Sequence, residues 1–322
     1  MKFLGSLITF TLLSICTVFS IPVNVYDGTF HYWISDDMRA TVMGVIDKNV
    51  LQVTIKPYVW YNNQRCYVHQ IGAAAFSNTA VQSIIINSNV QSMHFSPMAF
   101  YNAKNIRTIE LYTQKVTGEP SAFDNCGTNL GFIGVGTTSL INDLAKKILQ
   151  SWNLPVNKDY TNVSDYQKMR ALFDLAKKVK ENFSYNTKIA YPDNTAVVLA
   201  LKIGGTNGIS RAFRILALNM GFQYNDVHVG GDGGYYSWNL VHINKGNGKK
   251  WYNLDIVHTD FSSYTTRVFK TDSTQSSVTS VKPSKWIIFI NQYNFNGEQV
   301  YNPITENFTN WLIRNRQGVR AD

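Results

Sequence analysis

Short runs of alternating apolar and polar residues recur in the first half of the chain, each after an Ala-Phe pair. The pairs end at Phe76, Phe100 and Phe123, at a nearly constant spacing. The runs that follow have the periodicity of β-strands: residues 81–86, 106–111 and 130–135. A fixed period in the twenties predicts a solenoid, because one such unit cannot bury its own apolar face. With a lead-in hairpin around residues 51–58 and 64–71, the stacked units form a continuous core.

The periodicity becomes helical in the second half of the chain. Apolar residues from Met169 to Phe183 repeat at helical spacing after Ser164-Asp165, which is suited to cap a helix. A second helix is expected to begin near residues 205–207 and to end at Gly221. Three later runs are expected to be strands: residues 226–229, 237–243 and 251–255. The second half therefore predicts an α+β domain in which a helix is backed by an antiparallel sheet.

The first twenty residues have the pattern of a secretory signal peptide. Lys2 precedes a short apolar run, and residues 18–20 provide an acceptable cleavage site. We therefore expect a secreted protein without a membrane span. A length of 322 residues suits two domains, and the change of pattern near residues 136–138 places their boundary. We expect domains at residues 21–138 and 139–322, the second with a C-terminal extension, residues 281–322, to which no function is assigned.

Export changes the expectation for the cysteines. After removal of the signal peptide the chain keeps Cys66 and Cys126, an even pair in an oxidising compartment. We expect a disulfide between them, with two buried free thiols as the alternative. Three sequons are candidate glycosylation sites, at Asn162, Asn182 and Asn307.

Composition and charge restrict the function classes. Hydrophobic residues make up 44% of the chain and its mean hydropathy is −0.16, which excludes extended disorder. The net charge is +9, and the excess of Lys and Arg in the mature chain lies in the second domain. This excess favours an anionic polysaccharide or a cell surface as a partner. Nucleic acid is not expected, since the chain has no recognisable nucleic-acid-reading motif.

The N-terminal repeats resemble the BspA-like leucine-rich repeats over residues 40–138. Those repeats open with a strand, a polar turn, a second strand that ends in Ile-Gly, and then Ala-Phe. Matching segments occur here in the same order: residues 53–55, 62–64, 67–72 and 75–76. The resemblance implies a surface or secreted recognition module, with a structural spacer as the alternative.

The second domain resembles the transglutaminase-like group of the papain-like superfamily over residues 140–270. In that family a catalytic Cys opens a helix, a His begins a strand and an Asp ends the next strand. Three segments match in order: residues 204–213, 236–241 and 251–255. The resemblance places Thr206, Tyr236 and Asp255 at the three catalytic positions.

Two of these residues lack the required chemistry. A Cys at a helix N-terminus has a lowered pKa and supplies a thiolate, whereas a threonine hydroxyl needs an adjacent base. Tyr236 is protonated at neutral pH and does not take up a proton as imidazole does. Only Asp255 is retained, so we expect a pseudoenzyme without catalytic residues, cofactor or metal. A rebuilt site that pairs Thr206 or Ser210 with one of the histidines His228, His242 and His258 is the alternative. A metal site at Asp255, His258 and Asp260 is weighed against an ordinary loop and is not expected.

The degenerate site keeps aromatic and polar residues that suit a ligand. Tyr235, Tyr236 and Trp238, with Asp232 in the adjacent glycine-rich loop, are the candidate ligand-binding residues. Against this, Trp238 and Tyr236 also suit a role as core packing. We therefore expect a secreted, non-catalytic binding or adhesion protein whose partner is an extracellular polysaccharide, a cell surface or a protein. The alternatives are a hydrolase or transamidase with a Ser- or Thr-based site and a self-associating extracellular structural protein.

Overall fold

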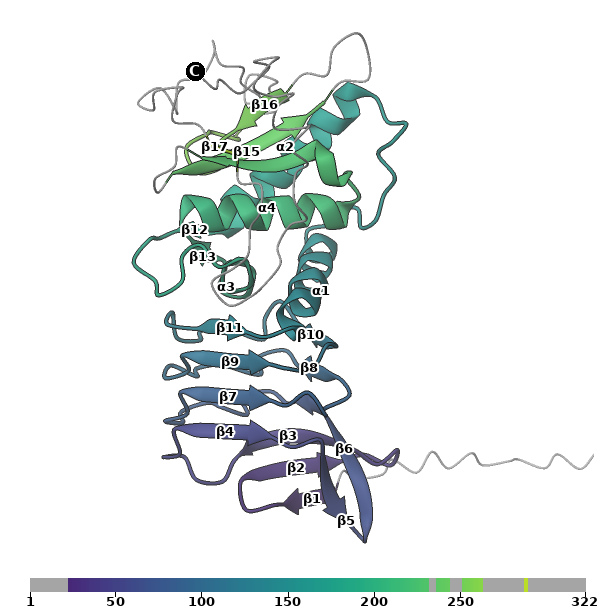
Figure 1. Ribbon diagram of the computed structural model, residues 1–322, viewed down its shortest axis with the longest axis vertical. Helices are drawn as coiled ribbons and strands as arrows, with labels where there is room; N and C mark the ends of the chain where they lie inside the picture. Colours follow the sequence, from purple (N-terminus) through teal and green to yellow (C-terminus); the bar gives the residue numbers. More distant parts are fainter. Residues whose placement is uncertain (1–22, 232–235, 244–250, 263–286, 289–322) are drawn as a thin grey trace, which may run out of the picture.

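The computed structural model describes residues 23–231, 236–243, 251–262 and 287–288. Stacked β-coils form one end of the molecule, and helices with a small sheet form the other (Figure 1). One hydrophobic core runs through both parts, from Phe30 in the coils to Phe261 beside the small sheet. The coils and the helical part are therefore packed against each other directly.

Two sheets form the walls of the solenoid. One contains four parallel strands in the order β11-β9-β7-β4, with the bounds Gly131–Ile133, Thr108–Leu111, Ser83–Ile86 and Gln52–Ile55. The other has the order β1-β2-β3-β6-β8-β10, with the bounds Val23–Tyr26, Phe30–Ile34, Arg39–Val45, Gln64–Ile71, Met93–Phe95 and Val116–Gly118. In the second sheet β1, β2 and β3 are antiparallel and the remaining pairs on this path are parallel.

The Ala-Phe pairs build the interior of the solenoid. The ring of Phe100 stacks on Phe76 at 5.7 Å and on Phe123 at 4.9 Å between centroids, and all three side chains are buried. Because the coils repeat at the spacing of neighbouring strands, equivalent residues lie directly above one another. This ladder confirms the solenoid that the residue period predicts.

The lead-in segment differs in part from the expected hairpin. The hairpin is formed by β5 (Tyr58–Tyr61) and β6, which pair antiparallel. The expected first strand, β4, instead pairs parallel with β7 and belongs to the first coil. The short strands β8 and β10 were not expected, because three residues are too few for a clear alternating pattern.

Four helices and two small sheets form the second part. The helices α1, α2, α3 and α4 have the bounds Gly136–Ser151, Asp165–Asn182, Thr195–Leu201 and Thr206–Met220. The strands β12 and β13, with the bounds Ser184–Tyr185 and Ile203–Gly204, form a parallel pair. The antiparallel sheet has the order β16-β15-β14-β17, with the bounds Trp251–Leu254, Ser237–His242, Val227–Gly231 and Ile287–Ile288. A short 3₁₀ turn, Tyr224–Asp226, leads into β14.

The ends of the two expected helices follow from local chemistry. Ser164 caps α2 through a reciprocal capping box with Gln167. Gly221 ends α4 at a φ of 116°, where a Cβ would collide with the backbone of Lys158. The helices α1 and α3 were not anticipated as elements of the second part.

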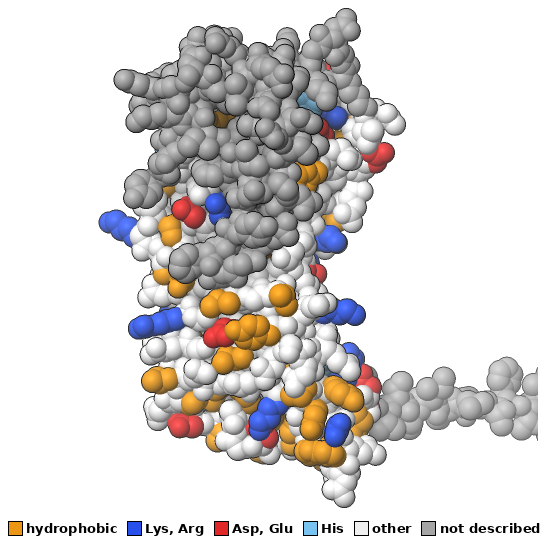
Figure 2. Space-filling model, in the orientation of Figure 1, with side chains coloured by type: hydrophobic (Ala, Val, Ile, Leu, Met, Phe, Trp, Pro, Cys, Tyr) orange, Lys and Arg blue, Asp and Glu red, His pale blue; other side chains and the backbone are white. Residues whose placement is uncertain are grey.

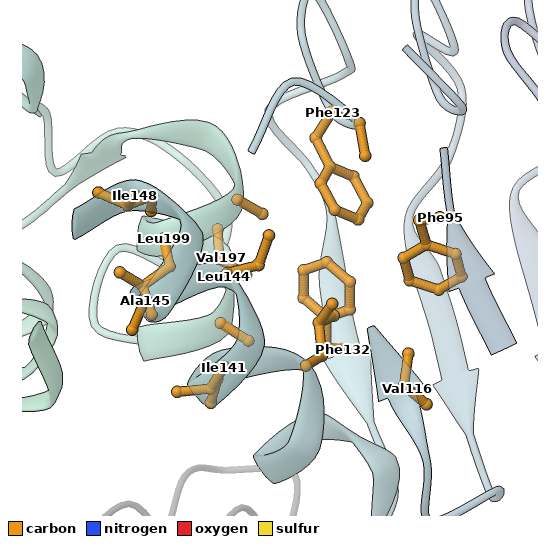
Figure 3. Close-up of a cluster of buried hydrophobic side chains, with 14 of the residues drawn as sticks. Phe95, Val116, Phe123, Phe132, Ile141, Leu144, Ala145, Ile148, Val197 and Leu199 are labelled. Atoms are coloured by element: carbon orange, nitrogen blue, oxygen red, sulfur yellow. The ribbon is translucent and has the colours of Figure 1, made fainter. Parts of the chain in front are cut away.

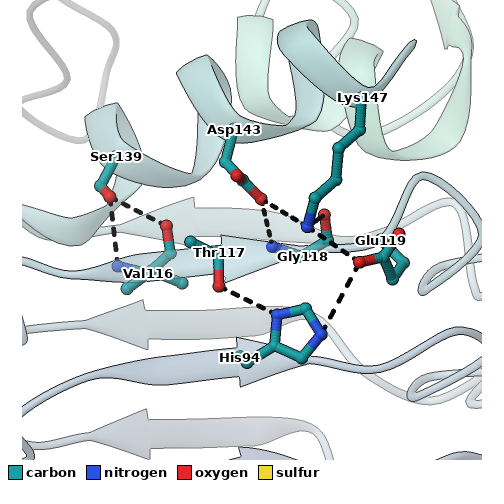
Figure 4. A network of polar contacts seen from close by, with 8 residues as sticks. All are labelled: His94, Val116, Thr117, Gly118, Glu119, Ser139, Asp143 and Lys147. Atoms are coloured by element: carbon teal, nitrogen blue, oxygen red, sulfur yellow. Dashed lines mark hydrogen bonds and ion pairs between the residues drawn. The ribbon is translucent and has the colours of Figure 1, made fainter. Parts of the chain in front are cut away.

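Helices α1 and α3 cover the last coil of the solenoid. Figure 3 shows Ile141, Leu144 and Val197 facing the ring of Phe132, all of them buried. Polar contacts surround this apolar junction (Figure 4). Lys147 on α1 lies 2.8 Å from Glu119 and 3.0 Å from its own-helix neighbour Asp143. The helical part thus closes the open end of the coils.

The expected disulfide is wrong for this structure. Cys66 and Cys126 are both buried and both free. Cys66 lies in the β5–β6 hairpin, whereas the Cys126 thiol donates to the carbonyl of Ala103 near the last coil. The hairpin and the last coil are separated by two strand spacings of about 4.8 Å each, which is too far for a disulfide.

Candidate functional site

The N-terminus of α4 lies beside the antiparallel sheet and carries Thr206. The Thr206 side chain is 2% exposed, and its hydroxyl oxygen accepts a hydrogen bond of 3.1 Å from the amide of Ser237 at the start of β15. Gly208, in the first turn of the helix, is required because a Cβ there would collide with the carbonyl oxygen of Pro192. This close approach brings the helix end against the preceding loop and fixes the position of Thr206.

A partly desolvated carboxylate, that of the exposed residue Asp193, lies at the same helix end. Burial raises the pKa of Asp193, while the charge of Arg211 and a hydrogen bond from the amide of Gly208 act in the opposite direction. A carboxylate that engages the first amides of a helix competes with any other anion at this place. The environment of Thr206 is therefore unfavourable for an anionic nucleophile.

Tyr236, Asp255 and His258 form a hydrogen-bonded group across the end of the sheet. The Tyr236 hydroxyl donates to Oδ2 of Asp255 and lies 2.9 Å from Nδ1 of His258. The amide of His258 donates to Oδ1 of Asp255 at 3.1 Å, and the imidazole Nδ1 lies 3.4 Å from the same oxygen. Asp255 is 3% exposed, so these bonds satisfy a buried carboxylate.

The structure thus brings the three predicted positions to one region. Thr206 contacts Ser237, the next residue after Tyr236, and Tyr236 contacts Asp255. The hydroxyl of Tyr236 occupies the oxygen of Asp255 that would orient an imidazole in a catalytic triad. A phenol hydroxyl that donates in this way is not a base, so this arrangement supports hydrogen bonding and not nucleophile activation.

His258 was weighed from the sequence as a metal ligand with Asp255 and as a base for a rebuilt site, but not as a partner of Tyr236. The side chain is exposed, and its ring lies 5.1 Å from the ring of Tyr236 and 6.3 Å from that of Tyr185. The spacing of three residues between Asp255 and His258 is the available signal, because an Asp oxygen commonly accepts from an amide a few residues later.

The other histidines weighed for a rebuilt site have partners elsewhere. His242, at the end of β15, lies 3.3 Å from Asp226, the residue before β14. His228 is buried in β14, where its carbonyl accepts from the side chain of Asn239 at 3.2 Å. The same amide nitrogen donates to the carbonyl of Ser210 at 2.8 Å, which ties α4 to the sheet.

The predicted aromatic ligand surface is wrong for Trp238. Its side chain is 1% exposed, so the structure has the core packing that was weighed against a ligand role, and the ring presents no face to a ligand. Tyr236 is half-buried, with its hydroxyl engaged as described. Asp232 and Tyr235 lie outside the described residues. A small cavity of about 70 Å³ lies next to the group, lined by seven residues: Val179, Lys180, Phe183, Tyr185, Ile209, Ile256 and Val257.

The remaining predicted sites are surface positions or loops. Asn162 precedes α2 and Asn182 ends it, and both side chains are exposed. Asn307 lies outside the described residues. Asp260 accepts from the amide of Ser262 at 2.8 Å. Within the described ranges no three His, Cys, Asp or Glu side chains are grouped to hold a metal ion. Of the helices described, none is long and apolar enough to cross a bilayer.

Comparison with solved structures finds leucine-rich repeat proteins. The chain is similar to a leucine-rich cell-surface protein of Faecalibacterium prausnitzii, with 21% identity and a TM-score of 0.28 over 38% of this chain and 32% of that one. Leucine-rich repeat proteins of Bacteroides capillosus and Bacteroides ovatus match with 19% and 21% identity, each with a TM-score of 0.23 over 36% of this chain. The match extends over 78% of the Bacteroides capillosus chain and over 39% of the Bacteroides ovatus chain. The chain thus spans about a third of the Faecalibacterium protein. No protein-family model matches the chain. No curated protein matches it either.

Proposed function

We propose that this chain is a secreted, non-catalytic binding protein in which a leucine-rich-repeat solenoid is joined to a degenerate transglutaminase-like domain. The observation that carries the proposal is the hydrogen bond from Tyr236 to Asp255. In the alignment on which the proposal rests, this phenol stands at the position where transglutaminase-like enzymes need an imidazole. A phenol at that position does not act as the base that a threonine nucleophile requires.

The remaining support comes from the arrangement of the two parts. The continuous core and the ion pair between Lys147 and Glu119 join the solenoid to the helical part. The resemblance of the coils to BspA-like repeats favours recognition at the surface of a cell or in the extracellular space. The basic excess of the second domain adds a preference for anionic surfaces.

Depletion of the purified chain from solution tests the binding role. Residues 21–322 are mixed with insoluble polysaccharides and with intact cells, at low and at high salt. Saturable depletion that persists at high salt is expected, because the specific contacts are not purely electrostatic. Depletion at low salt only would show that the basic surface alone causes the binding. No depletion by any material would contradict the proposal.

A second candidate is favoured by the position of His258. Its imidazole lies 3.4 Å from Asp255, so a histidine and its orienting carboxylate are present, although the histidine comes from a different place in the chain. For catalysis this imidazole must serve a hydroxyl, and the group nearest to its Nδ1 here is the phenol of Tyr236. Hydrolysis or transamidation that His258→Ala and Thr206→Ala each abolish would establish this candidate.

A further inference from the structure

The end of the solenoid farthest from the helices carries exposed aromatic side chains. Tyr26 on β1 is 64% exposed and Trp60 on β5 is 56% exposed. Figure 2 shows hydrophobic side chains gathered at this end of the molecule, with Lys or Arg side chains among them. Large aromatic residues are usually buried at least in part, and a group of them on one surface marks an interaction site.

These side chains line a hollow of about 590 Å³, which we call the aromatic groove. Its lining residues come from the β1 end, the β4–β5 turn, β5 and the turn after β7: Tyr26, Asp27, Lys56, Pro57, Tyr58, Val59, Trp60 and Asn89. A hollow of this size is in the range that holds a small organic ligand or a few units of a chain. It is therefore more than a flat aromatic patch.

The rings of the groove are held in place before any ligand arrives. The rings of Tyr58 and Trp60 meet edge to face at 5.7 Å, and the guanidinium of Arg65 lies 4.7 Å and 5.4 Å from their centroids. Tyr26 stacks on His31 at 4.9 Å with an interplanar angle of 13°. Such contacts fix the side-chain orientations, so binding orders few further groups.

Polar groups lie between these rings. Asp27 accepts hydrogen bonds of 2.9 Å from the amides of Thr29 and Phe30, and its other oxygen lies 3.1 Å from Nζ of Lys56. Burial raises the pKa of Asp27, but these hydrogen bonds outweigh burial and hold the pKa below its usual value. The Lys56 side chain is 52% exposed, and the exposed Asn89 offers both a donor and an acceptor.

The charge balance points to a neutral ligand. Asp27 and Lys56 neutralise each other inside the groove, and Lys and Arg equal Asp and Glu in number over residues 21–139. Arg65 adds one further cation at the edge of the groove, and a single cation is not the extended basic surface that favours a polyanion. A neutral molecule that offers flat C–H faces to aromatic rings and hydroxyls to polar groups is a sugar. Pyranose rings with equatorial hydroxyls have such faces on both sides.

We propose that the aromatic groove binds neutral polysaccharide chains of pyranose units with equatorial hydroxyls. Sugar rings stack on Trp60 and Tyr26, and their hydroxyls form hydrogen bonds with Lys56 and Asn89. The inference deepens the proposed function by naming the ligand class and the site, and it rests on that binding role. It moves the saccharide site from the degenerate catalytic positions to the opposite end of the molecule.

Titration with two series of soluble oligosaccharides tests the site. Residues 21–322 are titrated calorimetrically with cello-oligosaccharides and chito-oligosaccharides, with heparin as an anionic comparison. The account expects saturable binding of a neutral series that Trp60→Ala and Tyr26→Ala each weaken about tenfold or more. Trp60→Phe retains part of the affinity because it keeps an aromatic face. Tyr112→Ala is the matched control, because this 42% exposed tyrosine lies outside the groove.

The outcomes separate this inference from the proposed function. Neutral oligosaccharides that do not bind, or that bind equally to the wild type and Trp60→Ala, overturn the groove as a saccharide site. If the same protein is still depleted by polysaccharides or cells at high salt, the binding role stands and only the site is wrong. Self-association that Trp60→Ala removes, without sugar binding, makes the groove a contact between copies and also overturns the inference. Circular dichroism of each variant verifies that it is folded.

Discussion

The hydroxyl of Tyr236 donates a hydrogen bond to the carboxylate of Asp255, which is 3% exposed. Under the proposed transglutaminase-like alignment, the two residues stand at the positions of an imidazole and its orienting carboxylate. The same contact satisfies the buried carboxylate of Asp255. The proposal therefore assigns this contact a structural role in place of a catalytic one.

Removal of the Tyr236 hydroxyl leaves one oxygen of a buried carboxylate with fewer partners. We expect Tyr236→Phe to lower the free energy of unfolding by about 1–3 kcal/mol. Urea denaturation followed by circular dichroism measures the change. Tyr112→Phe is the control, because its hydroxyl donates to Glu110 at an exposed position where water replaces the bond. Equal stabilities of the two variants would contradict the importance of the Tyr236 contact.

Introduction of a Cys and a His at the predicted triad positions tests the transglutaminase-like geometry. In the double variant Thr206→Cys with Tyr236→His, a thiol and an imidazole stand beside Asp255. We expect this thiol to react with iodoacetamide near pH 7 several-fold faster than that of Thr206→Cys alone, because an adjacent imidazole favours the thiolate. Identical alkylation rates, measured by mass spectrometry, would show that the two positions do not face each other.

The junction between the solenoid and α1 makes stability depend on pH. Burial lowers the pKa of His94, and the charge of Lys147 lowers it further, against the opposing effect of Glu119. Burial also lowers the pKa of His69. The unfolded chain therefore binds more protons than the folded chain at mildly acidic pH, and stability falls as pH drops below about 6.5.

Urea denaturation at about pH 7.5 and at about pH 5.5 measures this dependence. The difference in unfolding free energy is expected to shrink in His94→Gln and to shrink further when His69→Gln is added. His31→Gln is the control, since this residue lies outside the junction on β2. A wild-type stability that is constant or rises toward the lower pH would be inconsistent with the lowered pKa values of the two half-buried histidines.

The two cysteines are expected to be free and unreactive in the folded protein. Burial raises the pKa of the Cys126 thiol to about 11, so little thiolate is present at neutral pH. Cys66 is also fully buried. Without reductant, iodoacetamide should modify both thiols in denaturant and neither in the native state, as counted by intact mass. Two unmodified cysteines after denaturation would instead establish a disulfide.

The repeats were predictable because their chemistry recurs along the chain. Phe76, Phe100 and Phe123 mark the period directly, and the period requires the stacked rings that the structure contains. The limits of α4 were also predictable, since Gly221 supplies a clear end signal. Local residue types carry this information without reference to the rest of the fold.

Features that depend on distant contacts were not predictable. For Trp238 the sequence left a ligand-facing ring and core packing open, and the structure buries the side chain. The aromatic groove combines residues from β1, β5 and the turn after β7, which have no common sequence motif. The even number of cysteines suggested a disulfide, but the stacking of coils places Cys66 and Cys126 too far apart. Burial and proximity of this kind arise from tertiary structure.

The central claim is that the second domain does not catalyse the reactions of the family it resembles. Its most direct test is an assay of the purified wild type for transamidation and hydrolysis of glutamine-containing peptides, beside Thr206→Ala and an enzyme-free blank. The account predicts that the wild type, the variant and the blank give the same rate. Wild-type turnover above the blank that Thr206→Ala abolishes would contradict it.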